Sequence, residues 1–335
     1  MSQLQILLHR FPDGHPVPED FEAVQGPLPE LGEGQILCRN EVLSLDPYLR
    51  GVISGRQIYA QKLEPGDVMF GTTVAEVVES KAEGFRVGER VVVPGCWQEY
   101  AAVNATEARR IDETWGSGSV HLGVLGMPGL TGWAGMAQLA EPKPGDTVVV
   151  SAASGPVGST AGQLAREAGC NVVGIAGGER KCEFVTDELG FDACVDYREG
   201  ALTAKLKAAC PDGIDVYFDN VGGDTLQAVL LNLALGARIT LCGLITQYNA
   251  AETPPGPNLG PVIGARAIMK GLVVYDFYDR FPEFLQDAGP LVQSGRLKYQ
   301  EDWTEGLADA PAAFARLMRG ENFGKTLVRI ADAES

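Results

Sequence analysis

One stretch of the chain, residues 147–158, constrains the fold more than any other. It begins as a β-branched run, Thr147–Val150, continues through small residues, and ends in Gly155-Pro156-Val157-Gly158. Small residues let backbone N–H groups approach an anion at a tight turn, and the N-terminus of a following helix adds its positive dipole end. The stretch therefore predicts the phosphate-binding turn of a dinucleotide fold. Its A-x-x-G-x-x-G spacing differs from G-x-G-x-x-G, so the context must support the interpretation.

The chain on either side of this turn alternates between apolar runs and helical patterns, such as Gly158–Ala168 and Arg180–Leu189. Strands alternating with helices are typical of a doubly wound parallel sheet, the Rossmann arrangement. We therefore predict an α/β domain over residues 124–297. Its expected strands are Thr147–Val150, Asn171–Ile175, Ala193–Asp196, Ile214–Phe218, Arg238–Cys242 and Leu272–Tyr275.

The rest of the chain has a different pattern. Residues 1–123 contain short β-like runs separated by Gly and Pro, which predict an antiparallel, barrel-like domain. Residues 298–335 contain a helical pattern around Ala310–Met318 and a last apolar run, Lys325–Ile330, which we expect to return to the first domain. We thus expect two domains, one of residues 1–123 with 298–335 and one of residues 124–297.

Composition excludes several classes of partner. The 335 residues carry a formal net charge of −17, which argues against a nucleic-acid or anionic-membrane surface. The N-terminus lacks a signal-peptide pattern, and no run approaches 18 apolar residues, so we expect a cytoplasmic protein. Seven scattered cysteines without a C-x-x-C pair fit reduced thiols in a reducing compartment.

Seven motifs spread over nearly the whole chain form a recognisable set. They are Ser44–Gly51, Leu125–Thr131, Ala152–Gly158, Phe218–Gly223, Cys242–Asn249, Pro254–Pro257 and Asn322–Lys325. Together these motifs resemble the zinc-independent branch of the medium-chain dehydrogenase/reductase family, which comprises NADPH-dependent 2-alkenal, prostaglandin and curcumin reductases. The resemblance implies a Rossmann domain for NADP(H), a GroES-like catalytic domain and a homodimer.

The end of the second expected strand bears on the choice of cofactor. It reads Gly174–Gly178 without a carboxylate, and Arg180 and Lys181 follow after Glu179. An NAD-preferring fold usually has Asp or Glu at this position, so the pattern favours NADPH. The alternative is that the two basic residues lie on a solvated helix face. The resemblance implies that Lys181 binds the 2′-phosphate and that Tyr197 packs nearby.

Other cofactor contacts come partly from position and partly from the resemblance. Asn220 follows the fourth expected strand, where its amide could bind ribose or phosphate, or could instead belong to a turn before Gly222-Gly223. The resemblance implies that the backbone of Leu272–Val274 binds the nicotinamide carboxamide and that Asn322 reaches back to the cofactor. The full expected set is Gly155, Pro156, Val157, Gly158, Lys181, Tyr197, Asn220, Cys242, Gly243, Leu244, Leu272, Val273, Val274 and Asn322.

The ligands of a zinc enzyme are missing from the sequence. Where zinc-dependent relatives have Gly-His-Glu, this chain reads Phe70–Thr73, and where they have a first Cys it reads Leu45-Asp46-Pro47. Catalytic zinc needs three protein ligands, and structural zinc needs a close cysteine cluster. We therefore predict no metal site.

Without a Lewis acid, hydride transfer to a conjugated enone or enal is easier than transfer to an isolated ketone. The resemblance implies that Tyr248 hydrogen-bonds to the developing enolate. Alternatively, Tyr248 anchors the loop toward Pro254–Pro257. Tyr48 and Tyr275 are expected either to line the substrate pocket or to be core aromatics. A quinone reductase of the same family, or a non-catalytic NADPH-binding protein, would share these features.

Overall fold

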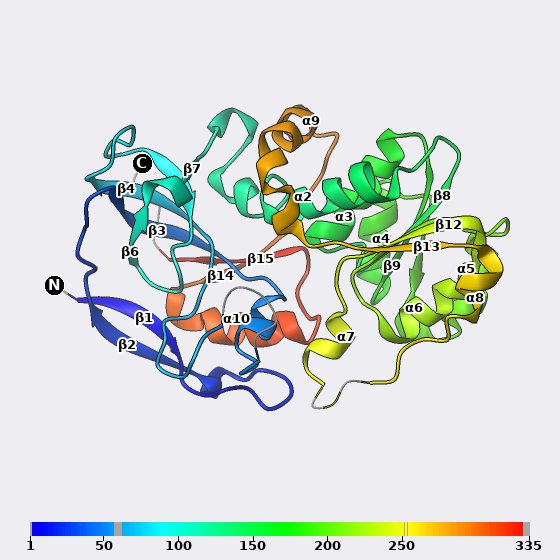
Figure 1. The fold of residues 1–335 in the computed structure, drawn as a ribbon, viewed down its shortest axis with the longest axis horizontal. Coiled ribbons are helices and arrows are strands. Elements are labelled where there is room, and N and C mark those ends of the chain that lie inside the picture. The colour runs from blue at the N-terminus through cyan, green and yellow to red at the C-terminus, as the bar shows by residue number, and fades with distance from the viewer. Residues whose placement is uncertain (1, 57–61, 251, 253, 331–335) are drawn as a thin grey trace. The chain divides into compact units, whose positions relative to one another are not determined.

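The computed structural model describes residues 2–56, 62–250, 252 and 254–330. The chain divides into two compact units, one of Met1–Leu122 with Glu301–Ser335 and one of Gly123–Gln300 (Figure 1). We refer to the first as the β-rich unit and to the second as the parallel-sheet unit.

The parallel-sheet unit is built on six strands in the order β10-β9-β8-β11-β12-β13, and each neighbouring pair is parallel. This is the strand order of the doubly wound dinucleotide fold, so the predicted fold class is confirmed. The order reverses between β8 and β11, and ligands bind such folds at the carboxyl ends of the strands beside this point. The strands are β8 (Thr147–Ser151), β9 (Asn171–Ala176), β10 (Ala193–Asp196), β11 (Ile214–Asp219), β12 (Leu233–Leu241) and β13 (Ile268–Gly271).

The central strands of this sheet carry apolar side chains on both faces, so both faces are covered by packed residues. Val148 and Val150 of β8 pack in one core cluster, and Val149 between them packs in the other. Alternate side chains of a strand point to opposite faces, so a continuous apolar run needs a layer on each face. The helices are α2 (Met127–Trp133), α3 (Pro156–Glu167), α4 (Glu179–Glu183), α5 (Leu202–Ala209), α6 (Gly223–Leu230), α7 (Ile245–Tyr248), α8 (Gly260–Ala265) and α9 (Phe281–Gln293).

Two predicted elements differ from the structure. The helix expected over Arg180–Leu189 forms as α4 followed by a π-helical turn, Phe184–Glu188. The strand expected over Leu272–Tyr275 is wrong, because β13 lies earlier and Val274–Arg280 is a 3-10 helix. Pairing with β12 ends at Gly271, opposite Leu241, so the more β-prone residues beyond it have no neighbouring strand.

The β-rich unit contains a seven-stranded sheet and a two-stranded one. Strand β1 (Ser2–Leu8) pairs antiparallel with β2 (Phe21–Pro27). The larger sheet has the order β14-β15-β3-β4-β5-β7, with β6 also paired to β3, and only its β14–β15 pair is parallel. Its strands are β3 (Gln35–Ser44), β4 (Thr73–Ser80), β5 (Arg90–Val93), β6 (Tyr100–Asn104), β7 (Arg109–Arg110), β14 (Glu301–Glu305) and β15 (Lys325–Arg329), and its helices are α1 (Leu49–Val52) and α10 (Ala310–Met318).

The C-terminal segment completes this larger sheet. Strand β15 pairs antiparallel with β3, with Val328 opposite Leu43. Helix α10 contributes Phe314 to an aromatic cluster with Phe21 and Trp97, whose ring centroids lie 5.6 to 6.2 Å apart. In the part of the chain that the structure describes, no helix is long and apolar enough to cross a membrane.

Candidate functional site

The turn between β8 and α3 has the geometry of an anion-binding loop. Ala152 has a positive φ of 49°, and the N–H of Gly155 donates to the Ala152 carbonyl at 2.9 Å. Gly155 is the extended N-cap of α3, Pro156 occupies its first turn, and no side chain caps the helix. The first N–H groups of a helix have no intrahelical acceptor, so this end of α3 can donate to an anion.

Gly158 is required by the close approach of α3 to the turn. A Cβ at this position would lie 2.5 Å from the Ala152 carbonyl oxygen and 3.0 Å from the Ala153 Cα. Both contacts are with backbone, which cannot rotate away. The final glycine of the predicted motif therefore permits close packing of the helix against the turn.

A buried polar network joins the ends of the two central strands, β8 and β11. Ser151 Oγ donates to Asp219 Oδ1 at 3.1 Å, and the same oxygen accepts from the Tyr217 hydroxyl at 2.7 Å. It also accepts the N–H groups of Val221 and Gly222 at 2.9 and 3.0 Å. Burial raises the pKa of the Asp219 carboxyl. This network, which the sequence interpretation missed, shapes the turn that carries Asn220.

Asn220 is held at the end of β11 by Ser151. Its N–H donates to Ser151 Oγ at 2.9 Å, and its side-chain amide donates to the Ser151 carbonyl at 2.7 Å. The Asn220 side chain is partly exposed, in contrast to the fully buried Asp219 before it. Asn220 therefore takes part in the turn, and its carboxamide lies at the carboxyl edge of the sheet beside the β8 turn.

The loop after β12 lies against the same edge. The N–H groups of Cys242 and Gly243 donate to the Asp219 carbonyl at 2.8 and 3.1 Å. A Cβ at Gly243 would lie 3.2 Å from the Tyr248 hydroxyl and 3.3 Å from the Asn220 carbonyl oxygen. The structure thus brings Tyr248, Gly243 and Asn220 together, at the carboxyl ends of β11 and β12.

Three further details define this loop. Thr246 Oγ1 donates to the Val221 carbonyl at 2.8 Å, which ties α7 to the turn after β11. Burial raises the pKa of the Cys242 thiol to about 12, so this thiol is neutral near pH 7 and is a poor nucleophile. Leu244 follows, and a Cβ at Gly222 would lie 2.7 Å from its Cδ2.

The end of β9 forms a second part of the candidate site. Gly178 has a φ of +94°, and the N–H of Lys181 donates to its carbonyl at 3.1 Å. A Cβ at Gly177 would lie 2.9 Å from the Tyr197 hydroxyl and 3.0 Å from Arg198 Nε. Tyr197 and Arg198 therefore both approach Gly177, and Arg198 also approaches Gly178, whereas the sequence interpretation named only Tyr197. The adjacent basic residue in Tyr197-Arg198 was the available signal.

The segment after β13 does not have the expected strand conformation. Leu272 is buried, and its N–H donates to the Leu241 carbonyl at 2.9 Å. Val273 is 44% exposed, and Val274 begins the 3-10 helix. Tyr275 is 41% exposed and packs edge-on against Tyr278 at 5.3 Å, so the core alternative for Tyr275 is wrong.

The β-rich unit contains the remaining expected site residues. Tyr48 is partly exposed and precedes α1, two residues after the buried Asp46. Lys325 Nζ donates to Asp46 Oδ1 and to the Leu45 carbonyl, each at 2.7 Å, and Ser44 Oγ donates to the other Asp46 oxygen. Burial lowers the pKa of Lys325 against the opposing effect of Asp46. This ion pair fixes the backbone before Tyr48.

Asn322 precedes β15 in the same unit. Its side-chain amide donates to the Gly324 carbonyl at 2.8 Å, which closes the turn that leads into the strand. The side chain is partly exposed. The structure therefore gives Asn322 a local role in the turn, and the cofactor contact that the resemblance implies stays a prediction.

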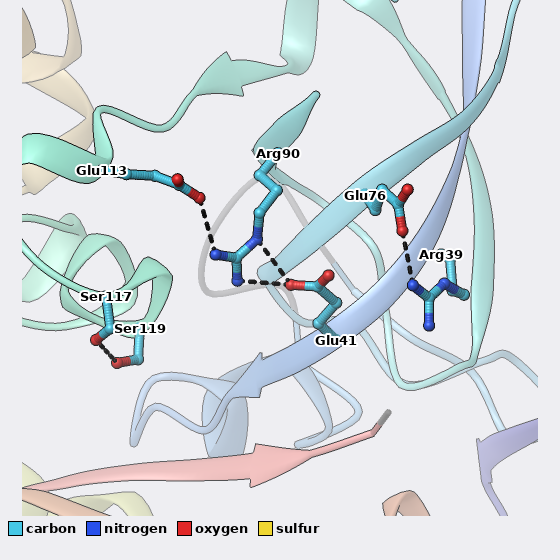
Figure 2. Close-up of polar contacts among 7 residues, drawn as sticks. All are labelled: Arg39, Glu41, Glu76, Arg90, Glu113, Ser117 and Ser119. Carbon is cyan, nitrogen blue, oxygen red and sulfur yellow. Dashed lines mark hydrogen bonds and ion pairs between the residues drawn. The ribbon is translucent and has the colours of Figure 1, made fainter. Parts of the chain in front are cut away.

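A cavity of about 700 Å³ lies in the β-rich unit but contains none of the expected site residues. Its walls carry Glu41, Glu76, Arg90 and Glu113. Arg90 pairs with Glu41 at 2.6 Å and Glu113 at 3.0 Å, and Arg39 pairs with Glu76 at 2.6 Å (Figure 2). These carboxylates are matched by guanidinium groups, so the cluster is a structural ion-pair network. Among the residues that the structure describes, no three His, Cys, Asp or Glu side chains could together hold a metal ion.

Comparison with known proteins agrees with this fold. A family described as the N-terminal domain of oxidoreductase matches residues 4–111, and one described as zinc-binding dehydrogenase matches residues 156–288. The chain belongs to the medium-chain dehydrogenase/reductase family of oxidoreductases, in its zinc-independent branch.

Its relatives include enzymes of known activity. The chain is 42% identical to the NADPH-dependent curcumin reductase of Escherichia coli, over 96% of this chain and 94% of that enzyme. It is 39% identical to the NADP(+)-dependent 2-alkenal reductase of Nicotiana tabacum, over 99% of this chain and 98% of that enzyme. The crystal structure of CurA from Vibrio vulnificus in complex with NADPH matches with a TM-score of 0.92 and 41% identity, over 98% of this chain and 100% of that one.

Proposed function

We propose that this chain is an NADPH-dependent enone reductase, which reduces the carbon–carbon double bond of α,β-unsaturated aldehydes and ketones. Hydride adds to the β-carbon, the carbonyl becomes an enolate, and a proton added at the α-carbon completes the reduction. The proposal rests chiefly on the placement of the Tyr248 hydroxyl beside Gly243 and Asn220 at the carboxyl edge of the sheet. The similarity to a curcumin reductase and a 2-alkenal reductase supports it.

The parallel-sheet unit fits a dinucleotide with a 2′-phosphate. The uncapped N-terminus of α3 and the turn at Gly155–Gly158 suit the pyrophosphate. Lys181 and Arg198 lie beside Gly177 and Gly178, which follow β9, and they would hold the 2′-phosphate with Tyr197 packed nearby. When bound, NADPH supplies the hydride.

The remaining contacts of the proposed cofactor site come from the backbone and from two asparagines. The N–H groups of Cys242 and Gly243 donate to the Asp219 carbonyl, so the Cys242–Leu244 backbone is held rigidly where it would line the proposed site. Asn220 offers its carboxamide at the end of β11, and the backbone of Leu272–Val274 would orient the nicotinamide. Asn322 of the β-rich unit would add a contact. These assignments rest on the family resemblance and on the positions of the residues at the strand ends.

Tyr248 would act on the substrate oxygen rather than on the cofactor. A phenol can donate a hydrogen bond that strengthens as negative charge develops on the carbonyl oxygen, which lowers the barrier selectively. Tyr48 is partly exposed and Tyr275 is exposed. Both would contribute apolar surface to the substrate pocket. The family resemblance also supports a homodimeric, cytoplasmic enzyme.

Product analysis tests this proposal. The purified protein is incubated with an open-chain enone and NADPH deuterated at the transferable position, and the product is examined by NMR. We expect one NADPH oxidised per enone and a saturated ketone with deuterium at the β-carbon. An allylic alcohol with deuterium at the carbonyl carbon, or turnover of flat quinones alone, would refute enone reduction. NADPH binding without turnover would indicate a non-catalytic protein.

A further inference from the structure

We propose that Cys182 and Cys194 form a reversible disulfide under peroxide, and that this bond weakens the binding of NADPH. The two cysteines lie in the parallel-sheet unit, Cys182 in α4 and Cys194 in β10. The consequence for the cofactor rests on the proposed function, whereas formation of the disulfide does not.

The proposal rests on the geometry of the two thiols. Their sulfur atoms lie 3.0 Å apart, and the Cys194 thiol donates a hydrogen bond to Cys182 Sγ. A disulfide has an S–S bond of about 2.05 Å, so the sulfurs need to approach by only about 1 Å. Both residues are partly exposed, which allows a small oxidant to reach them.

The strand next to Cys194 leaves room for this pair. Cys194 is paired in register with Gly174 of β9, and a Cβ at Gly174 would lie 3.4 Å from Cys194 Sγ. The same Cβ would lie 2.7 Å from Val185. The absence of a side chain at position 174 therefore lets the thiol and the segment after α4 pack onto the strand together.

The hydrogen bond assigns a role to each thiol. Because Cys182 Sγ is the acceptor, its thiolate is the form that Cys194 stabilises, and Cys182 is the attacking residue. The Cys182 thiolate attacks hydrogen peroxide, the O–O bond breaks, and Cys182 sulfenic acid forms with release of one water after protonation. Cys194 then attacks this sulfur and displaces a second water. Two thiols are oxidised to one disulfide as one peroxide is reduced to two waters.

Burial affects the rate of this reaction. It raises the pKa of both thiols, so only a small fraction of Cys182 is thiolate at neutral pH. The carboxylates of Asp196 and Glu199 also raise the pKa of Cys182. We therefore expect a slow reaction that requires sustained peroxide, as suits a response to oxidative conditions rather than a catalytic step.

The position of Cys182 links its oxidation to the proposed 2′-phosphate site. Its N–H donates to the Gly178 carbonyl at 3.2 Å, and the N–H of Lys181 donates to the same oxygen at 3.1 Å. Cys194 lies three residues before Tyr197, on the strand that leads to Arg198. Drawing α4 toward β10 thus displaces the groups that would hold the 2′-phosphate, and a displacement of about 1 Å is enough to weaken a preorganised site.

The purified full-length protein is treated with hydrogen peroxide, and its cysteine pairing is mapped by mass spectrometry without reduction. The KM values for NADPH and NADH are then measured. We expect a Cys182–Cys194 cross-link, a KM for NADPH raised on the order of tenfold, and an unchanged KM for NADH. Dithiothreitol should restore the original value. Cys182→Ser and Cys194→Ser should show neither cross-link nor change.

Cys170→Ser provides the matched control in the same unit. The Cys170 thiol donates to the Lys143 carbonyl at 3.3 Å, a bond that a serine hydroxyl can replace, so this variant should respond to peroxide like the original protein. Alkylation of both Cys182 and Cys194 after peroxide would overturn the proposal. So would a cross-link that leaves KM for NADPH unchanged in a protein that binds NADPH when reduced. Absence of NADPH binding in the reduced protein would instead refute the proposed function.

Discussion

The hydroxyl of Tyr248 can lie close to Gly243 because glycine has no side chain, and hydrogen bonds hold the Gly243 backbone in place. A Cβ at Gly243 would approach its hydroxyl to 3.2 Å, and the Gly243 N–H is bonded to the Asp219 carbonyl. Asp219 is in turn fixed by Ser151 and Tyr217. A hydrogen-bond donor held in this way requires little reorganisation when charge develops on a substrate oxygen.

The Tyr248→Phe variant removes this donor and retains the aromatic ring. We expect kcat for enone reduction to fall by about tenfold or more and the KM for NADPH to change little, because the lost interaction belongs to the transition state. Steady-state kinetics with an enone and NADPH measure both constants. A variant with full turnover would leave Tyr248 only the alternative role of anchoring its loop.

Two cations beside the glycines that follow β9, one in α4 and one just after β10, should determine the preference for NADPH. Lys181→Ala removes one of them, and Arg198→Ala removes the other, whose Nη1 lies 3.6 Å from a Cβ placed on Gly178. We expect each variant to raise the KM for NADPH by about tenfold and to leave that for NADH nearly unchanged, because only NADPH has the 2′-phosphate. Arg180→Ala tests whether the neighbouring basic residue contributes to the same preference. Equal losses with both cofactors would locate the 2′-phosphate elsewhere.

At the scale of elements, the turn from β8 into α3 depends on close packing between a helix and a strand end. The approach at Gly158 leaves no space for a side chain, since the contact is with the backbone of Ala152. The same closeness aims the N-terminus of α3 at the carboxyl edge of the sheet. Packing and anion binding therefore depend on the same residue.

Gly158→Ala tests this dependence. Overpacking against backbone costs about 1–3 kcal/mol, so we expect a lower free energy of unfolding together with a raised KM for NADPH. Gly264→Ala in α8 is the control, because no atom lies within 4 Å of its added Cβ. The higher helix propensity of alanine should make that variant neutral or about 0.5–1 kcal/mol more stable. Chemical denaturation compares the two, and equal stability would contradict the packing argument.

Both units contain charged or titratable groups that are buried. In the β-rich unit His121 is only 1% exposed, and its Nε2 and Nδ1 contact the Asp112 carbonyl at 3.2 Å and Arg109 at 3.3 Å. One ring nitrogen facing a carbonyl and the other a guanidinium suits a neutral imidazole. Burial, followed by the Arg109 charge, lowers the pKa of His121 to about 4.

This shift predicts how stability depends on pH. The unfolded chain takes up a proton on His121 near pH 6.5, whereas the folded β-rich unit resists it until about pH 4, so the stability from the neutral ring is lost as pH falls between these values. We expect a loss on the order of 3 kcal/mol that His121→Gln does not show. His9→Gln, at an exposed histidine, is the control. Parallel pH profiles of unfolding for all three proteins would contradict this.

Local sequence determined much of this protein. The alternation of strands and helices and the turn after β8 follow from local residue patterns, so they could be predicted from the chain alone. The strand predicted over Leu272–Tyr275 was wrong, because the end of the partner strand β12 decided where pairing stops.

Tertiary structure decided the contacts between residues that are distant in the chain. Lys325 pairs with Asp46 across 279 positions, Arg198 reaches the glycines that follow β9, and Cys194 meets Cys182. No local pattern encodes these contacts, because they follow from sheet order and packing rather than from propensity. The sequence thus determined that a dinucleotide-type fold would form, and the packing of its strand ends determined which side chains meet there.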